Sequence, residues 1–260
     1  MSAEREYGTL LVELEENVAT VTLNRPERLN AFNEEMVADV DHLWSWVRDD
    51  DDVHAVVLRA AGDRGFCAGV DAREGPWWQE QAVFRQEDPG NVLGAKAQHV
   101  WKPVIVAVHG IAAGGAMYFL NEADIVIASE DAVFFDPHQS AGLVSALEPI
   151  GMLQRGVPLG DVLRWALTGN DERITAQTAL RLGIVTEVVA RDELWPAAGR
   201  LAREIAARRP DAVQGTVRAI WEALDVPPSI ARQRGLAYTQ LGNGAQAPDL
   251  SIPRVTPRYR

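Results

Sequence analysis

Two glycine-containing segments hold the residues of this chain that could do chemistry. One of them, Gly-Ile-Ala-Ala-Gly-Gly at 110–115, follows a continuous apolar run at 104–108 and precedes a helix-forming stretch at 116–120. A strand that passes through glycines into a helix leaves free backbone N–H groups at the positive end of the helix dipole. Such an end binds phosphate or stabilises an oxyanion as its charge develops.

An oxyanion is the favoured ligand of 110–115. The chain contains no Gly-x-x-x-x-Gly-Lys-Ser/Thr motif, and 110–115 lacks the Gly-x-Gly-x-x-Gly spacing of dinucleotide sites. By itself the glycine pair is explained equally well by close backbone packing. The second segment, Phe-Cys-Ala-Gly-Val-Asp at 66–71, makes the combination specific.

Together these segments resemble the crotonase (enoyl-CoA hydratase/isomerase) family, and the resemblance covers most of the chain. Three further blocks occur in the family's order: Asn-Arg-Pro with Leu-Asn-Ala-Phe at 24–32, Ala-Asp-Ile-Val-Ile-Ala at 123–128, and Leu-Thr-Gly, Ile-Thr-Ala and Leu-Gly-Ile-Val between 167 and 185. The chain is therefore identified as a member of this family.

The resemblance implies an oxyanion hole for the thioester oxygen of an acyl-CoA. The alignment of the motifs places its two backbone donors at Val70 and Gly115, where they would stabilise an enolate. CoA would enter as part of the substrate, with no other cofactor. Residues expected around the substrate and CoA are Arg25, Arg28, Ala68, Asp71 and Gly114, the arginines because guanidinium groups match phosphate oxygens.

Both glutamates that hydratases of this family use are replaced. The first position falls on Tyr118 and the second on His138. Histidine is well suited to proton transfer near neutral pH, and Asp136, two residues away, could orient the imidazole. Glu148 is a second candidate partner. A buried structural tyrosine and a structural histidine are the alternatives, so the expected catalytic residues are Val70, Gly115, His138, Tyr118 and Asp136.

Two other functions remain open. The Pro-His-x-x-x-Gly pattern at 137–142 is similar to the β-diketone hydrolase branch, which cleaves C–C bonds by retro-Claisen chemistry with a histidine. That branch places an aspartate where this chain has Leu147, with Glu148 one residue later. A non-catalytic acyl-CoA-binding protein is the other alternative. The favoured function is enoyl-CoA hydratase/isomerase-like enolate chemistry, as a lyase or isomerase.

Composition favours a soluble enzyme. The 37 acidic and 25 basic residues give a net charge of −12, which argues against a nucleic-acid surface. Cys67 is the only cysteine, and no histidine has metal-ligand spacing with a second histidine or cysteine. The polar N-terminus and the lack of a long apolar run predict a cytoplasmic protein without a membrane span.

Alternating strand and helix patterns predict an α/β fold, and the resemblance specifies a crotonase-like spiral of ββα units over 1–191 with a helical trimerisation domain over 192–260. A hairpin is expected at 10–14 and 18–23, and a helix is expected to begin after Asn33. The turn-rich segment 75–94 would cover the acyl pocket, where Trp77 and Trp78 favour a bulky or aromatic acyl group. The expected assembly is a homotrimer or a hexamer formed as a dimer of trimers.

Overall fold

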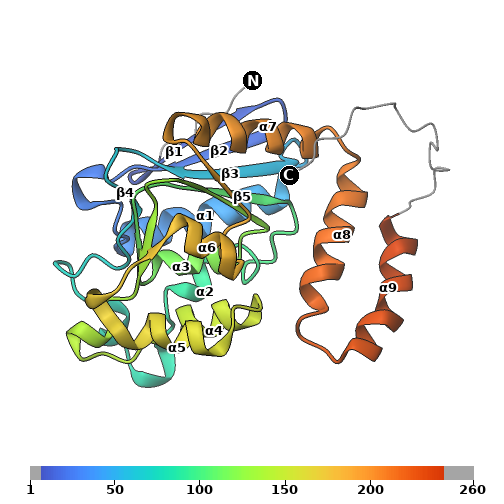
Figure 1. The fold of residues 1–260 in the computed structure, drawn as a ribbon. Helices are drawn as coiled ribbons and strands as arrows, with labels where there is room; N and C mark the ends of the chain where they lie inside the picture. The colour runs from blue at the N-terminus through green and yellow to red at the C-terminus, as the bar shows by residue number, and fades with distance from the viewer. Residues whose placement is uncertain (1–6, 243–260) are drawn as a thin grey trace. The chain divides into compact units, whose positions relative to one another are not determined.

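A computed structural model describes residues 7–242 and divides the chain into two units, 1–208 and 209–260 (Figure 1). The first unit contains a six-stranded sheet in the order β1-β2-β3-β5-β7-β10. Only β1 runs antiparallel to its neighbour. The strands are β1 Leu10–Glu15, β2 Val18–Leu23, β3 Ala55–Ala60, β5 Val104–Val108, β7 Ile125–Ser129 and β10 Glu187–Val189.

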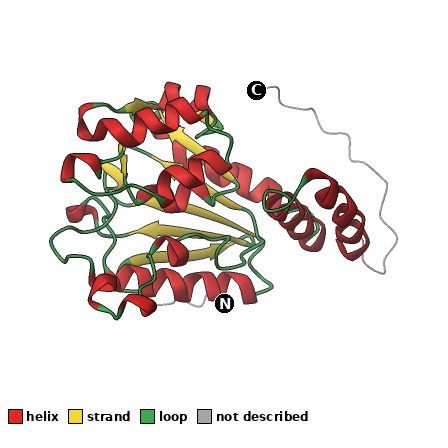
Figure 2. Ribbon diagram, turned by 90° about the horizontal axis from the view of Figure 1, so that it is seen from below, coloured by secondary structure: helices red, strands yellow, loops and turns green. Residues whose placement is uncertain are grey.

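Helices cover both faces of this sheet, as Figure 2 shows from below. The central strands are apolar throughout because a parallel sheet is buried on both sides. Ala55, Ile105 and Ile127 face one layer, where they pack against α7 (Leu194–Ala206). The alternate residues of these strands face a larger core that includes α1 (Glu34–Asp49).

Helix α1 begins where the sequence predicts. The Asn33 side chain accepts a hydrogen bond from the Met36 N–H at 3.0 Å, which caps the helix N-terminus. The predicted hairpin is also confirmed, with β1 and β2 paired from Leu10–Leu23 to Glu15–Val18.

A second sheet carries the glycine segments. Its order is β4-β6-β8-β9, with β4 Gly65–Cys67, β6 Ile111–Ala113, β8 Val133–Phe135 and β9 Ile174–Thr175. Because β4 and β6 run parallel, the residues that follow them emerge at the same edge. The remaining helices of this unit are α2 Gly90–Leu93, α3 Ala116–Asn121, α4 Leu147–Gln154, α5 Leu159–Thr168 and α6 Ala176–Leu182.

The second unit contains α8 (Pro210–Glu222) and α9 (Pro228–Gly242), which pack against each other. Helix α7 was expected in the C-terminal domain, but its Ala198 and Ala202 are buried on the sheet of the first unit. The compact units divide after Arg208, and the expected boundary of a trimerisation domain at 191/192 stays a prediction. Residues 243–260 of the expected domain lie outside the described residues.

Candidate active site

The two predicted oxyanion donors lie next to each other. Gly69 has φ +85°, and an ideal Cβ on it would lie 3.1 Å from the Gly115 nitrogen, so only glycine allows this close approach. Phe32 bridges the residues on either side of Val70, donating to the Gly69 carbonyl at 2.9 Å and accepting from the Asp71 N–H at 2.8 Å. Neither the Val70 N–H nor the Gly115 N–H donates to another residue in the described part of the chain. Both remain free for an oxyanion.

His138 lies beside this pair of amides. It follows β8, which pairs with the strand that leads to Gly115. An ideal Cβ on Gly114 would lie 3.7 Å from Cε1 of His138. The imidazole therefore lies within contact distance of the segment that leads to the Gly115 N–H.

Asp136 holds the imidazole. Its Oδ1 accepts the His138 backbone N–H at 3.0 Å and is paired with Nδ1 of the ring. The Asp136 side chain is fully buried, whereas that of His138 is 23% exposed. The interaction with Asp136 raises the pKa of His138 above its usual value, although burial opposes it. Burial pushes the pKa of Asp136 upward, but hydrogen bonds from His138 and Ser145 outweigh it and leave the pKa lowered.

Glu148 faces the other ring nitrogen. Its Oε1 lies 3.8 Å from Nε2 of His138, and the side chain is 3% exposed. This oxygen has no hydrogen-bond partner among residues 7–242. Asn121 fixes the segment by donating to the Glu148 carbonyl at 2.9 Å. Burial raises the pKa of the Glu148 carboxyl.

Tyr118, in the first turn of α3, lies beside the oxyanion glycine. An ideal Cβ on Gly115 would lie 3.0 Å from its Cε2 atom. Burial is the main cause that raises the pKa of Tyr118, and the carboxylates of Glu148 and Asp88 raise it further. The phenol therefore stays protonated and acts as a hydrogen-bond donor and not as a base.

Arg25 braces the first oxyanion segment. Its guanidinium donates to the Ala31 carbonyl at 2.5 Å, to Asp71 at 3.1 Å and to Glu74 at 2.9 Å. The Arg25 and Asp71 side chains are only 12% and 6% exposed. Contacts of Arg25 and of the half-buried Arg28 with CoA stay predictions.

Ala68 and Gly114 complete the backbone around the two donors. The Ala68 N–H donates to the Leu29 carbonyl, and the Gly114 N–H donates to the Phe135 carbonyl, both at 3.1 Å. These bonds fix the segments on either side of the free amides. Trp77 and Trp78, from the segment expected to cover the acyl pocket, contact each other edge to face with ring centroids 4.8 Å apart.

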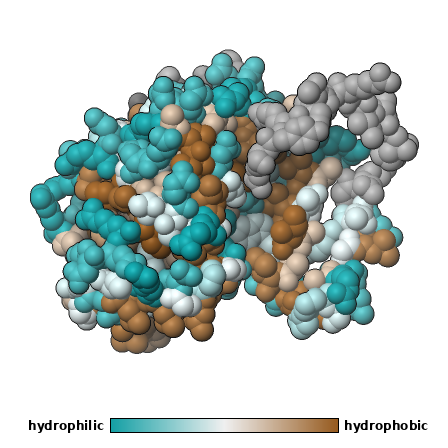
Figure 3. Space-filling view, viewed as in Figure 1, coloured by the Kyte–Doolittle hydropathy of each residue, from teal (hydrophilic) through white to brown (hydrophobic). Residues whose placement is uncertain are grey.

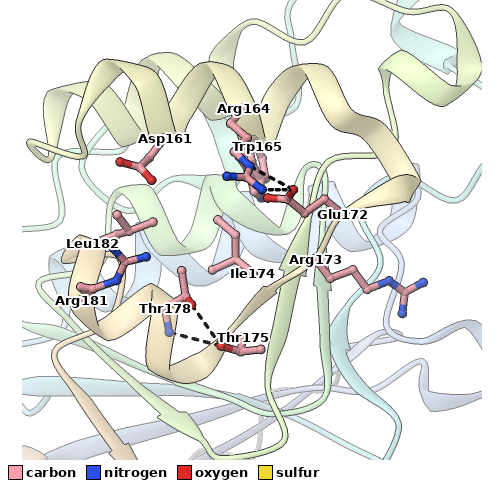
Figure 4. Close-up of a pocket in the computed structure, with 10 residues that line it drawn as sticks. All are labelled: Asp161, Arg164, Trp165, Glu172, Arg173, Ile174, Thr175, Thr178, Arg181 and Leu182. Carbon is pink, nitrogen blue, oxygen red and sulfur yellow. Dashed lines mark hydrogen bonds and ion pairs between the residues drawn. The ribbon is translucent and has the colours of Figure 1, made fainter.

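A separate cavity of about 240 Å³ lies between α5, β9 and α6 (Figure 4). Arg164 pairs there with Glu172 at 2.9 and 2.7 Å, and Thr178 donates its backbone N–H to Thr175. None of the predicted site residues lines this cavity. Within 7–242, no group of three or more histidine, cysteine or acidic residues could hold a metal ion.

Comparisons with known proteins agree with the geometry. The profile of the Enoyl-CoA hydratase/isomerase family matches residues 13–239. The chain belongs to the enoyl-CoA hydratase/isomerase family. It is 34% identical over 231 residues to the (E)-benzylidenesuccinyl-CoA hydratase of Thauera aromatica, covering 88% of this chain and 87% of that protein. It is also 36% identical over 203 residues to the 1,2-epoxyphenylacetyl-CoA isomerase of Escherichia coli K12, covering 76% of each.

Solved structures of this family share the fold. An enoyl-CoA hydratase/isomerase from Mycobacterium paratuberculosis superposes with a TM-score of 0.86 at 34% identity, over 93% of this chain and 92% of that chain. A putative enoyl-CoA hydratase from Streptomyces coelicolor A3(2) gives a TM-score of 0.84 at 30% identity, over 95% and 90% of the two chains. The crotonase assignment and the α/β fold are confirmed, and the protein is an enzyme of the hydratase/isomerase type that acts on an acyl-CoA.

The structure brings the predicted donors Val70 and Gly115 and His138 close together, and their roles stay predictions. The brace at Arg25 and the approach of Asp88 to Tyr118 were not predicted from the sequence. Both depend on contacts between distant segments, for which no local motif gives a signal.

None of the helices in residues 7–242 has the length and apolar character that a membrane crossing requires.

Proposed function

We propose that this enzyme adds water reversibly to an α,β-unsaturated acyl-CoA, with His138 and Glu148 in place of the usual two glutamates. The observation that carries this proposal is the separation of 3.8 Å between Nε2 of His138 and Oε1 of Glu148. That distance is too long for a direct hydrogen bond, but one water placed about 2.8 Å from each atom bridges them. The bridging water is the proposed nucleophile.

In the proposed reaction the thioester oxygen accepts hydrogen bonds from the Val70 and Gly115 N–H groups. Water attacks the β-carbon while His138 takes its proton at Nε2, and Asp136 stabilises the imidazolium. The electrons move to the thioester oxygen and form the enolate, which the two amides stabilise. Glu148 then protonates the α-carbon, and the proton on His138 returns to Glu148.

The raised pKa of Glu148 supports its role as the acid, whereas the raised pKa of His138 confines its role as a base to higher pH. In this proposal His138 and Glu148 hold one proton between them. The form with neutral imidazole and protonated carboxyl therefore has the same net charge as the form with imidazolium and carboxylate. The raised pKa of the buried Glu148 carboxyl favours its protonated form. Tyr118, which stays protonated, is proposed to hold the Glu148 carboxylate and not to carry a proton.

The test uses 2-enoyl-CoA thioesters in water labelled with ¹⁸O. Loss of the enoyl absorbance together with one labelled oxygen on the β-carbon supports hydration. His138→Gln and Glu148→Gln should each remove this activity, whereas Gln139→Glu, which changes the neighbouring exposed residue, serves as a control. Labelled product from His138→Gln at the wild-type rate contradicts the proposal.

A bulky or aromatic acyl group is proposed as the substrate. The names of two relatives contain aromatic acyl groups, benzylidenesuccinyl and epoxyphenylacetyl. The adjacent indoles of Trp77 and Trp78 supply aromatic surface in the segment that is expected to cover the pocket. Cinnamoyl-CoA should therefore be hydrated faster than crotonyl-CoA.

A retro-Claisen hydrolase is the second candidate, because each ring nitrogen of His138 faces a carboxylate. In that reaction water would add to one carbonyl of a β-diketone, and cleavage of the C–C bond would give a carboxylic acid and a ketone. Mass spectrometry distinguishes this pair of products from a hydrated thioester. Tight acyl-CoA binding without any product would instead favour a binding protein that has lost its catalysis.

A homotrimer or hexamer in the cytoplasm, with CoA present only as part of the substrate, is proposed as the working form. Exposed leucines recur at one-turn spacing on α5, at Leu159, Leu163 and Leu167. Figure 3 shows apolar side chains gathered at the lower edge of the first unit, where Figure 1 places α5. None of the side chains of α8 is buried, so this helix needs further partners. Light scattering on the purified chain measures the assembly directly.

A further inference from the structure

A third carboxylate, Asp88, approaches the proposed site from the segment 75–94. Its Oδ1 accepts the Gly90 N–H at 2.8 Å. An ideal Cβ on Gly90 would lie 3.1 Å from this oxygen and 3.0 Å from the ring of Tyr118. The carboxylate of Asp88 is therefore next to the aromatic ring that borders the oxyanion glycine.

Three carboxylates and one imidazole then make up the charge at this site. Asp136 and Glu148 lie at the two nitrogens of His138, and Asp88 lies beside Tyr118. Asp136 and Glu148 are buried, so water screens their charges poorly. Whether the one proton held by His138 and Glu148 lies on the imidazole or on the carboxyl, the site keeps a net negative charge, because Asp136 and Asp88 have no positive partner beyond it.

Within the part of the chain that the structure describes, no lysine or arginine is seen to offset this excess. The charged groups that act most strongly on Tyr118, His138 and Glu148 are carboxylates or the imidazole itself. Arg25 is committed to its brace. The Arg173 guanidinium lies 4.5 Å from the centroid of the Phe135 ring, and within residues 7–242 it forms no ion pair with the three carboxylates.

We infer that this site, unlike that of the benzylidenesuccinyl-CoA hydratase, whose acyl group carries a free carboxylate, accepts uncharged acyl groups and excludes acyl-CoA thioesters whose acyl chain carries a second carboxylate. Such a carboxylate would approach like charges in a poorly hydrated space with no cation to receive it, and specificity of this kind comes from repulsion. The reaction that the accepted thioesters undergo rests on the proposed function. The exclusion itself concerns binding and is measured without catalysis.

The binding experiment compares hexanoyl-CoA with adipoyl-CoA, two saturated six-carbon thioesters that differ in the terminal carboxylate. Calorimetry on the full-length protein should give a dissociation constant ~100-fold higher for adipoyl-CoA. Asp88→Asn keeps an oxygen to accept the Gly90 N–H and should reduce this ratio about tenfold. Asp192→Asn removes the same charge at an exposed position and should leave the ratio unchanged.

Equal affinity of the wild-type protein for the two thioesters would overturn the inference. The inference would also be overturned if the ratio of the two dissociation constants in Asp88→Asn equalled the ratio in wild type or in Asp192→Asn. The corresponding unsaturated thioesters, 2-hexenoyl-CoA and 2-hexenedioyl-CoA, test turnover in parallel. If neither reacts while the saturated pair is still discriminated, the proposed hydration fails and the exclusion of a second carboxylate stands.

Discussion

Oε1 of Glu148 lies 3.8 Å from Nε2 of His138, although the two side chains come from different elements of the chain. Asp136 fixes the opposite ring nitrogen, so Nε2 is the atom that is free to exchange a proton. This arrangement supplies the two groups on which the proposed acid–base chemistry depends.

Substituting His138 by alanine should reduce kcat on the true substrate by ~10²–10⁴ with little change in acyl-CoA affinity, because the group acts in the transition state. Asp136→Asn should reduce kcat by a smaller factor, since it removes the orienting partner and leaves the proton carrier in place. The control is the affinity for a saturated acyl-CoA, which both variants should retain. Full activity of His138→Ala would assign the histidine a structural role.

The pH profile provides a separate check on this pair. As a base, His138 must be neutral, so kcat/KM should rise with pH through the pKa of the free enzyme. The interaction with Asp136 raises that pKa above the reference value of about 6.5. In Asp136→Asn the rise should therefore move to lower pH, even though the maximal rate falls. A profile that does not move would exclude Asp136 as the cause.

The sequence predicts those features whose interacting residues lie close together along the chain. Local signals placed the hairpin, the cap at Asn33 and the glycine turns, because strand alternation, capping and positive φ depend on neighbouring residues. The alignment of this sequence with the motifs of the family singled out His138 as a candidate site residue. The position of Glu148 depends on how α4 docks on Asn121, which no local pattern encodes. The packing of α7 on the sheet likewise depends on contacts between distant segments, here between Ala198 and Ala202 and the central strands.

The oxyanion assignment is tested by replacing the Gly115 N–H with an ester oxygen, through incorporation of glycolic acid at this position. Proline is unsuitable, because an ideal Cβ on Gly115 would lie 2.7 Å from the ring of Phe32. Loss of one oxyanion donor should lower kcat by ~10²–10³. The same ester at Gly160, whose Cβ position is open, controls for the chemistry of incorporation. An unchanged rate at Gly115 would refute the assignment.

Arg25→Gln should destabilise the protein by about 3 kcal/mol, because it leaves the buried Asp71 carboxylate without its partner. Urea unfolding measures this change. Asp71→Asn in the same chain should recover part of the stability, and Arg28→Gln serves as the control. If Arg25 instead binds CoA phosphates, Arg25→Gln should weaken the binding of CoA thioesters more than that of pantetheine thioesters. The free energy of unfolding should then stay constant. The two outcomes separate a brace from a ligand contact.

His109 should make the protein less stable as the solution becomes acidic. It is fully buried, and neither ring nitrogen has a hydrogen-bond partner among the described residues. Burial is the main cause that lowers its pKa from 6.5 to about 4. The unfolded chain therefore binds a proton more readily than the folded one between these values. The stabilising contribution is complete above pH 6.5 and is lost as the pH falls to 4, at a total of about 3 kcal/mol.

The free energies of unfolding in urea at pH 7 and pH 4.5 measure this loss. His109→Gln should reduce the loss, and His42→Gln, at an exposed position, should leave it unchanged. An equal loss in wild type and His109→Gln would assign the acid sensitivity to other groups.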